Sequence, residues 1–243
     1  MKKIGQGLGI LLFTLVAWHI IAMILSTPVL PYPALVIRSL FSGLAGGLPL
    51  HIAYSSMRIA LSVLAALVVG LPLGIAIGYS KSLSRWLSPF LYLSYPIPKL
   101  ALMPVIMLLF GLGETSKTIM IFLILFFPVT VDIAGAARAM NKEVFQTMKA
   151  FGACDMAIAR CIVLPGVIPA VLDSLKVSLG IALSILFFAE NYGTQHGLGY
   201  FIMNSWQKMD YINLYAGILT LALMGFALFL ILDFIDDKVT AWR

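Results

Sequence analysis

The chain has 243 residues, of which 61% are apolar and only 11% are charged. Its mean hydropathy of +1.03 indicates that most of the chain lies in a lipid bilayer rather than in water. The formal net charge of +6 could suggest nucleic-acid binding, but the basic residues are scattered and form no stripe that could follow a phosphate backbone. Composition therefore argues against a soluble or nucleic-acid-binding protein and predicts one membrane domain.

The first apolar run covers residues 8–25 and follows two lysines. No small-residue cleavage site follows it before Pro28, so we expect a retained membrane span rather than a removed signal peptide. Residues 27–33 contain three prolines and predict an extended outer connection.

Five further segments have the composition of membrane-crossing helices, because a hydrocarbon core of roughly 30 Å needs about 20 apolar residues per helix. They are residues 59–79, a shorter proline-interrupted segment 101–112 with 92–97 upstream, and residues 118–133, 175–189 and 214–235. Gly70, Gly74 and Gly78 share one face of the first of these, a spacing that favours close helix packing. The sequence thus predicts an all-α integral membrane protein with about six transmembrane helices.

The distribution of Lys and Arg indicates the orientation of these spans. With a cytoplasmic N terminus, the inside segments hold the larger basic set: Lys2, Lys3, Lys81, Arg85, Arg138, Lys142, Lys149, Arg160, Lys238 and Arg243. The outside segments hold only Arg38, Arg58, Lys117 and Lys208. We therefore expect both termini in the cytoplasm. The expected organisation is an N-terminal helix with its outer loop in residues 1–54 and a core in residues 55–243.

Residues 136–166, between the fourth and fifth spans, are far more polar than their flanks and must lie in water. Asn141 can cap a helix with Glu143 in its first turn. One face of that helix is apolar and consists of Val144, Phe145, Met148 and Phe151. A short amphipathic helix beside a bilayer lies flat in the lipid interface or fills a groove in a partner protein, and amphipathicity alone leaves both open.

The end of this helix and the segment after it also have local signals. Gly152 can end the helix in a left-handed conformation, Asp155 can begin a second helix, and Pro165 with Gly166 is expected to stop it. Cys154 and Cys161 have no metal-ligand spacing and are expected to be small core residues.

The order of residues in this loop resembles that of a known family. Nine residues separate Gly152 from the sequence Ile162-Val163-Leu164-Pro165. This spacing resembles the Gly-x9-Ile-x-Leu-Pro core of the cytoplasmic loop of binding-protein-dependent ABC importer permeases. Residues 97–104 and 110–117 are similar to the third-span region of nitrate, sulfonate and taurine permeases, and residues 188–191 with 197–200 to the segment after their fifth span. The chain departs from the family where Gln146-Thr147-Met148 replaces Glu-Ala-Ala, and also at Asn191 and residues 193–196.

This resemblance implies a type I ABC importer permease fold in a bacterial or archaeal cytoplasmic membrane. It implies a transmembrane permease subunit that is not itself an enzyme and that binds no cofactor, with ATP and Mg²⁺ on a partner ATPase. The implied partners are two ATPase copies, a second permease copy that makes a homodimer, and an external solute-binding protein. The implied cargo is a sulfonate, nitrate or similar small anion, or a heterocycle of the thiamine-precursor kind.

The resemblance and the interruptions of the apolar spans select the candidate site residues. Those for ATPase coupling are Val144, Phe145, Met148, Phe151, Gly152, Ile162, Leu164 and Pro165. Those for the translocation path are Pro96, Pro98, Lys99, Met103, Glu190 and Asn191. A charge at the bilayer centre costs at least about 2.5–3.5 kcal/mol, so Lys99 and Glu190 are expected to face a cavity, each other or the interface. Snorkelling at a span end stays open for both.

Several other interpretations are weaker. Asp132, Asp173 and Lys176 are interpreted as span-end residues at the cytoplasmic surface. Residues 111–118 end in Lys-Thr like a phosphate loop, but Ser116 stands where the second glycine is required and no strand precedes them. The three histidines have no ligand spacing, so no metal site is predicted. A self-sufficient carrier or a membrane enzyme would leave the loop ending at Pro165 unexplained.

Overall fold

A computed structural model of the protein describes residues 2–241, with the side chains of residues 2–8, 11 and 142 left aside. Every regular element within this range is a helix, as the sequence predicts. The chain divides into a first unit, Met1–Ser55 with Glu190–Met224, and a second unit, Ser56–Ala189 with Gly225–Arg243. Arg243, one of the residues used to predict the topology, lies outside the described range.

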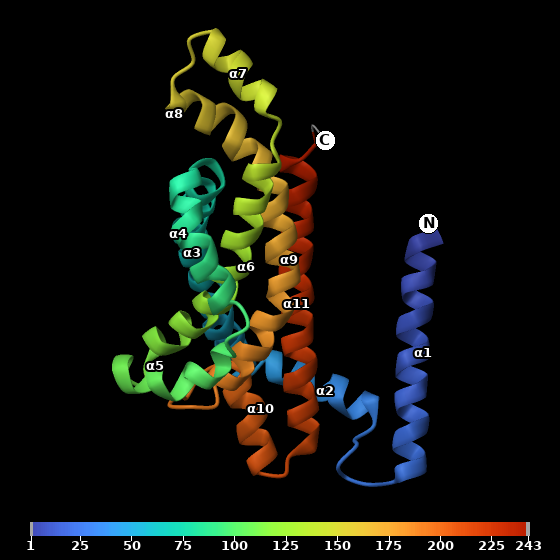
Figure 1. The fold of residues 1–243 in the computed structure, drawn as a ribbon. Coiled ribbons are helices and arrows are strands. Elements are labelled where there is room, and N and C mark those ends of the chain that lie inside the picture. Colours follow the sequence, from blue (N-terminus) through green and yellow to red (C-terminus); the bar gives the residue numbers. More distant parts are fainter. Residues whose placement is uncertain (1, 242–243) are drawn as a thin grey trace. The chain divides into compact units, whose positions relative to one another are not determined.

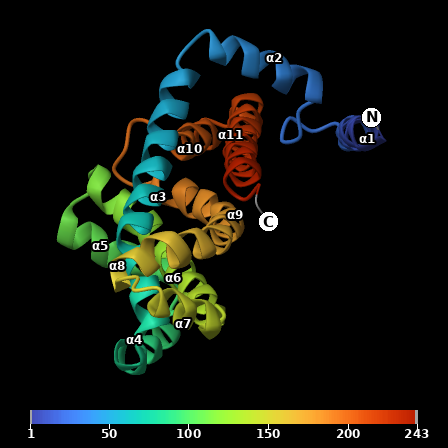
Figure 2. The same ribbon diagram turned by 90° about the horizontal axis from the view of Figure 1, so that it is seen from above.

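The first unit contains α1 (Lys2–Leu25), α2 (Pro33–Leu44), α10 (Leu198–Gln207), the start of α3 (Leu48–Tyr79) and the first half of α11 (Tyr211–Val239). α2 was not expected from the sequence. It begins at a proline, whose missing N–H costs nothing in a first helical turn, and its apolar face lies against α11. α10 and the start of α11 form a helical hairpin (Figure 2).

The second unit contains the rest of α3 and α11 and all the elements between them. They are α4 (Lys81–Ser94), the 3₁₀ helix η1 (Lys99–Leu102), α5 (Met103–Phe110), α6 (Glu114–Ala139), α7 (Lys142–Ala150), α8 (Asp155–Ile158), the π-helical segment η2 (Ala159–Val163) and α9 (Leu164–Ala189). α6 and α9 lie side by side along their length (Figures 1 and 2). Their facing residues, among them Val129, Ile133, Val167 and Val171, form the core of this unit.

The glycine face of α3 packs against α6, as its spacing predicts. A Cβ atom on Gly74 would lie 2.8 Å from the Cβ of Ile133, and one on Gly78 would lie 2.5 Å from the Cβ of Ala137. Real Cβ atoms do not approach other atoms this closely, so only glycine allows the two backbones to come together here.

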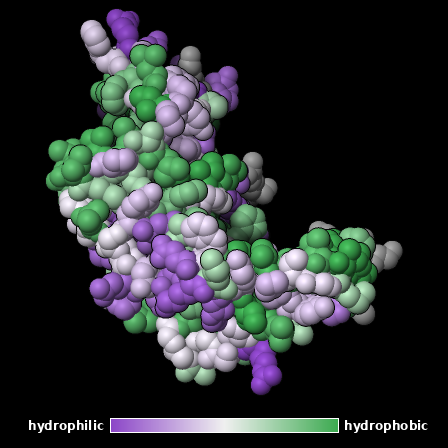
Figure 3. Space-filling view, turned by 90° about the horizontal axis from the view of Figure 1, so that it is seen from below, coloured by the Kyte–Doolittle hydropathy of each residue, from purple (hydrophilic) through white to green (hydrophobic). Residues whose placement is uncertain are grey.

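Four helical stretches in the described residues are long and apolar enough to cross a membrane: Leu48–Tyr79, Glu114–Ala139, Asp155–Ala189 and Tyr211–Val239. The pair Lys81–Ser94 and Lys99–Phe110, bent by 86°, would make a fifth. This pair corresponds to the predicted proline-interrupted third span. Within α1, Leu12–Leu25 counts only as a shorter apolar helix, so the count of six and the orientation stay predictions. Large hydrophobic areas cover the surface between hydrophilic clusters (Figure 3).

Candidate functional site

The candidate coupling loop stands beyond the ends of α6 and α9, at the top of Figure 1. α7 begins as predicted, because the side-chain oxygen of Asn141 accepts a hydrogen bond from the backbone N–H of Glu143 at 2.9 Å. Glu143 lies in the first turn and Lys149 in the last, so both charges complement the helix dipole.

α7 ends in a Schellman motif built around Gly152. The φ angle of Gly152 is +81°, and its N–H donates to the carbonyl of Lys149 at 2.9 Å. The N–H of Ala153 donates to the carbonyl of Met148 at 3.0 Å, which completes the pair of bonds that defines this motif. The left-handed conformation expected for Gly152 is therefore confirmed, and it fixes the angle between α7 and α8.

The predicted apolar face of α7 divides into an inner and an outer part. Phe145 and Met148 pack, partly buried, against the core cluster that contains Ile158, and the Phe145 ring lies 5.9 Å from that of Tyr79. Val144, by contrast, is 44% exposed. Sequence spacing could not distinguish the partly buried side chains of α7 from the exposed ones, because the distinction depends on where α8 and η2 lie.

The outward-facing apolar side chains come from both arms of the loop. Phe151 is 84% exposed at the end of α7, and Met156 is 73% exposed in α8. Together with Val144 they form a surface that we call the exposed loop patch. Sequence reasoning did not select Met156, since four-residue α8 is too short to show a periodic signal.

The segment after the loop corrects two expectations. The second helix does not stop at Pro165: it passes through η2 into α9, and Asp155–Ala189 forms one long apolar stretch. Pro165 has no N–H to donate to the carbonyl of Cys161, and the π-helical turn of η2, which contains Ile162, accommodates the lost bond. Cys154 and Cys161 are exposed, so the interpretation as core residues is wrong.

Charged groups link α7 to α8 and to the end of α3. The Lys149 ammonium lies 3.3 Å from an Asp155 carboxylate oxygen, and the Tyr79 hydroxyl donates to the same oxygen at 3.4 Å. The hydrogen bond to Asp155 raises the pKa of Lys149 above its usual value, so the lysine stays protonated. A cavity of about 490 Å³ beside α7 is lined by Tyr79, Lys149, Arg138 and Lys81.

Four of the candidate path residues lie near the break between α4 and α5, in the second unit. Pro96 and Pro98 are exposed in the break, and the Lys99 ammonium donates to the backbone carbonyls of Ser94, at 2.8 Å, and Tyr95. Lys99 therefore binds the carbonyl end of α4. Met103 is buried.

The other two candidate path residues lie in the first unit. Glu190 is fully buried, and its carboxylate accepts hydrogen bonds from the Ser55 hydroxyl and the Gly199 N–H, both at 2.7 Å. The Ser55 hydroxyl oxygen in turn accepts from the Leu198 N–H at 2.8 Å. These bonds satisfy the first N–H groups of α10, and sequence reasoning missed Ser55. Asn191 is half-buried. Lys99 and Glu190 belong to different units, so the alternative that they face each other stays a prediction.

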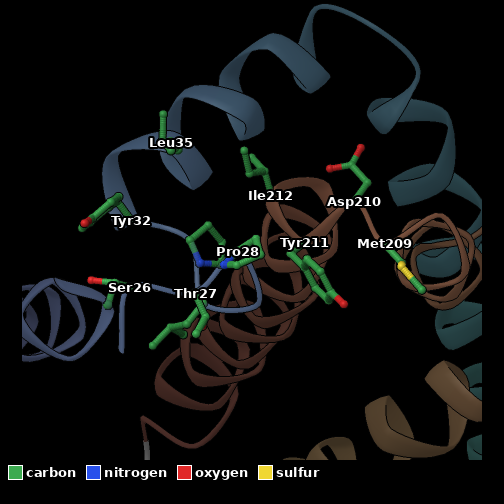
Figure 4. A pocket seen from close by; sticks show the side chains of 12 residues that line it. Ser26, Thr27, Pro28, Tyr32, Leu35, Met209, Asp210, Tyr211 and Ile212 are labelled. Carbon is green, nitrogen blue, oxygen red and sulfur yellow. The ribbon is translucent and has the colours of Figure 1, made fainter. Parts of the chain in front are cut away.

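A cavity of about 450 Å³ lies within the first unit, between the α1–α2 connection and the start of α11 (Figure 4). Ser26 and Met209, which line it, are the two non-glycine residues with positive φ angles in the described range. Asp210, also in its wall, caps α11 by accepting from the N–H of Asn213 at 3.1 Å.

Comparison with known proteins gives the family. Residues 70–241 match the family described as binding-protein-dependent transport system inner membrane component. The chain is 30% identical to the taurine transport system permease protein of Escherichia coli (strain K12), over 100% of this chain and 91% of that protein. It is 31% identical to a putative aliphatic sulfonates transport permease protein of Bacillus subtilis (strain 168), over 100% of this chain and 90% of that protein.

A third relative is the formylaminopyrimidine transport permease protein of Halalkalibacterium halodurans, which is 28% identical over 100% of this chain and 99% of that protein. The family match includes α6, the whole coupling loop and α9. The chain therefore belongs to the binding-protein-dependent inner membrane components, the permease subunits of ABC transporters.

Proposed function

We propose that the chain forms the translocation path of an ATP-driven importer for a small solute, which an external binding protein delivers. Two ATPase copies and a second copy of this permease complete the transporter, in the cytoplasmic membrane of a bacterium or archaeon. ATP and Mg²⁺ bind to the ATPase, and the permease contributes the moving helices. The family membership supports the permease role.

The observation that carries the ATPase partnership is the exposed loop patch of Val144, Phe151 and Met156. Exposed apolar side chains in a polar loop mark an interaction surface. Polar residues interrupt this patch, since Thr147 and Asp155 are exposed beside it. A short helix with a narrow apolar face fits a groove in a folded partner better than a flat lipid surface.

The inner part of the apolar face supports a mechanism of coupling. Phe145 and Met148 pack against the core cluster that includes Ile158 and Val163, which lead directly into membrane helix α9. A partner that displaces α7 would therefore also displace the foot of α9. For ATP binding to drive transport, the ATPase contacts must differ in free energy between two arrangements of these helices.

The cargo belongs to one of two chemical classes. Two relatives are named for taurine or aliphatic sulfonates, and a third for formylaminopyrimidine. We therefore propose a small sulfonate, nitrate or similar anion, or a heterocycle of the thiamine-precursor kind.

Replacing Phe151 and Met156 by alanine tests the docking surface. Both side chains are largely exposed, so their removal should leave the fold intact and weaken ATPase binding by about tenfold or more. The measurement is co-purification of the ATPase with the tagged permease from solubilised membranes. Phe41→Ala is the matched control, since Phe41 is 66% exposed in α2, outside the loop.

Gly152→Asp tests the same surface through its geometry. Nothing lies within 4 Å of a Cβ at this position, so only the positive φ angle opposes the substitution. We expect the angle between α7 and α8 to change and ATPase binding to fall. Undiminished co-purification of the ATPase with both variants would contradict the proposal.

A further inference from the structure

A cavity of about 630 Å³ opens on the second unit between α4, α6 and α9. Tyr92 and Tyr95 line it from α4, Asp132 from α6, and Asp173 and Ser174 from α9. The candidate path residues selected from the sequence are absent from its wall within the described residues.

The two carboxylates of this cavity lie inside membrane-crossing helices. Asp132 is about two turns before the end of α6, and Asp173 is the tenth residue of α9. Both side chains are exposed. An ionised carboxylate that faces lipid within a membrane-crossing helix is strongly unfavourable, so we expect this face to lie against water or protein. The interpretation of both residues as span-end groups at the cytoplasmic surface stays a prediction.

The carboxylates are not neutralised within the described part of the chain, where neither has an ion-pair partner. The Lys99 ammonium packs over the Tyr95 ring but donates to backbone carbonyls. The cavity is consequently acidic.

Ser174 gives an independent indication of a ligand. It is only 4% exposed, and its hydroxyl has no hydrogen-bond partner among the described residues. Buried polar side chains are nearly always paired, so an unpaired hydroxyl in a cavity wall calls for a specific explanation, such as a polar group that binds there. Ser174 lies next to Asp173 in the sequence, and its hydroxyl can donate or accept a hydrogen bond.

We infer that this cavity is a solute-passage site that takes solutes carrying a protonated amine or amino group in preference to simple anions. The inference rests on the proposed function, because it assumes that this chain forms the path. The carboxylates accept hydrogen bonds and attract cations, and the exposed Tyr92 and Tyr95 rings can stack on a heterocycle or contact an ammonium group. An amino-bearing sulfonate or an aminopyrimidine meets this requirement, whereas nitrate does not.

Charge-selective thiol labelling tests the inference without knowledge of the cargo. Cys154→Ser and Cys161→Ser remove both cysteines of the chain, and Val177→Cys then places a thiol in the cavity wall, where Val177 is 75% exposed. The variant is labelled in membrane vesicles containing the whole transporter. The probes are methanethiosulfonates carrying a trimethylammonium or a sulfonate group. The reference is the same cysteine-free chain with Ser82→Cys, at an exposed position of α4 outside the cavity.

We expect the ratio of cationic to anionic labelling rates to be about tenfold higher for Val177→Cys than for the reference. Adding Asp132→Asn and Asp173→Asn should return the ratio to that of the reference. Asp237→Asn, which removes an exposed carboxylate outside the cavity, should leave it unchanged.

Two results would overturn the inference: no labelling by either reagent, as lipid or a second copy over the cavity would cause, or a ratio equal to the reference. If the Asn variants fail to fold, the inference is judged by the ratio of cationic to anionic labelling rates of the Val177→Cys variant alone. ATPase co-purification is measured on the same preparation. Loss of the ATPase counts against the proposed function, whereas an unselective cavity with the ATPase present counts against this inference alone.

Discussion

Replacing Gly74 by alanine should loosen the contact between α3 and α6. The new Cβ would lie 2.7 Å from Cγ2 of Ile133 and 2.9 Å from the backbone carbonyl oxygen of Thr130. The carbonyl oxygen cannot rotate away, so one helix must shift. Overpacking of this kind costs about 1–3 kcal/mol, whereas alanine gains about 0.8–1 kcal/mol in helix propensity over glycine.

Gly135→Ala in α6 isolates the packing cost, because nothing lies within 4 Å of a Cβ there. Both variants gain the same propensity, so their difference in unfolding free energy is the overpacking cost of about 1–3 kcal/mol. Thermal unfolding of the purified permease in detergent measures this difference. Each kcal/mol should lower the Tm of Gly74→Ala by about 2–4 °C relative to Gly135→Ala. Equal Tm values for the two variants would refute the close-packing argument.

Two further predictions concern buried polar contacts. Glu114→Gln should destabilise the permease by about 1.5–3 kcal/mol, because the buried Arg58 guanidinium donates to both Glu114 carboxylate oxygens at 2.6 Å. Thermal unfolding measures this loss, and a Tm equal to that of the wild type would contradict the prediction. Ser55→Ala should cost about 1–3 kcal/mol, because the buried Glu190 carboxylate loses a donor. Its readout is faster hydrogen exchange of the α10 amides, and unchanged protection would show that Ser55 is dispensable.

The features predicted correctly from the sequence depend on neighbouring residues. The Asn141 cap and the Gly152 turn follow from bonds that span a few positions, so the residue types alone specify them. The glycine face of α3 was predictable for a similar reason, since helical periodicity places Gly70, Gly74 and Gly78 in one line.

The features that sequence reasoning missed depend on packing between distant segments. The division of the α7 face into partly buried Phe145 and exposed Phe151 is set by α8 and η2, which no periodicity in α7 reveals. The expected stop at Pro165 failed because a π-helical turn can absorb a missing N–H inside a long helix. α2 was missed because its prolines were taken as a sign of extended chain, although Pro33 is favourable as a first helical residue.

The hydrogen bonds of charged residues within the spans could not be predicted from the sequence. Charged residues are rare in apolar helices, and for that reason Lys99 and Glu190 were predicted to line the translocation path. Yet the buried Glu190 is held by Ser55 and backbone N–H groups, and the buried Lys117 ammonium donates to the carbonyls of Leu112 and Gly113 at 2.7 and 3.0 Å.

Charges whose hydrogen bonds are made within the fold stabilise the turns that they bind, and a passing solute gains little from them. Asp132 and Asp173 differ, because both are exposed in a cavity and have no ion-pair partner in the described chain. A permease needs groups that bind its cargo briefly and release it, and a charged group without a permanent partner fits this need. Whether a charge is paired therefore indicates its role better than how rare it is.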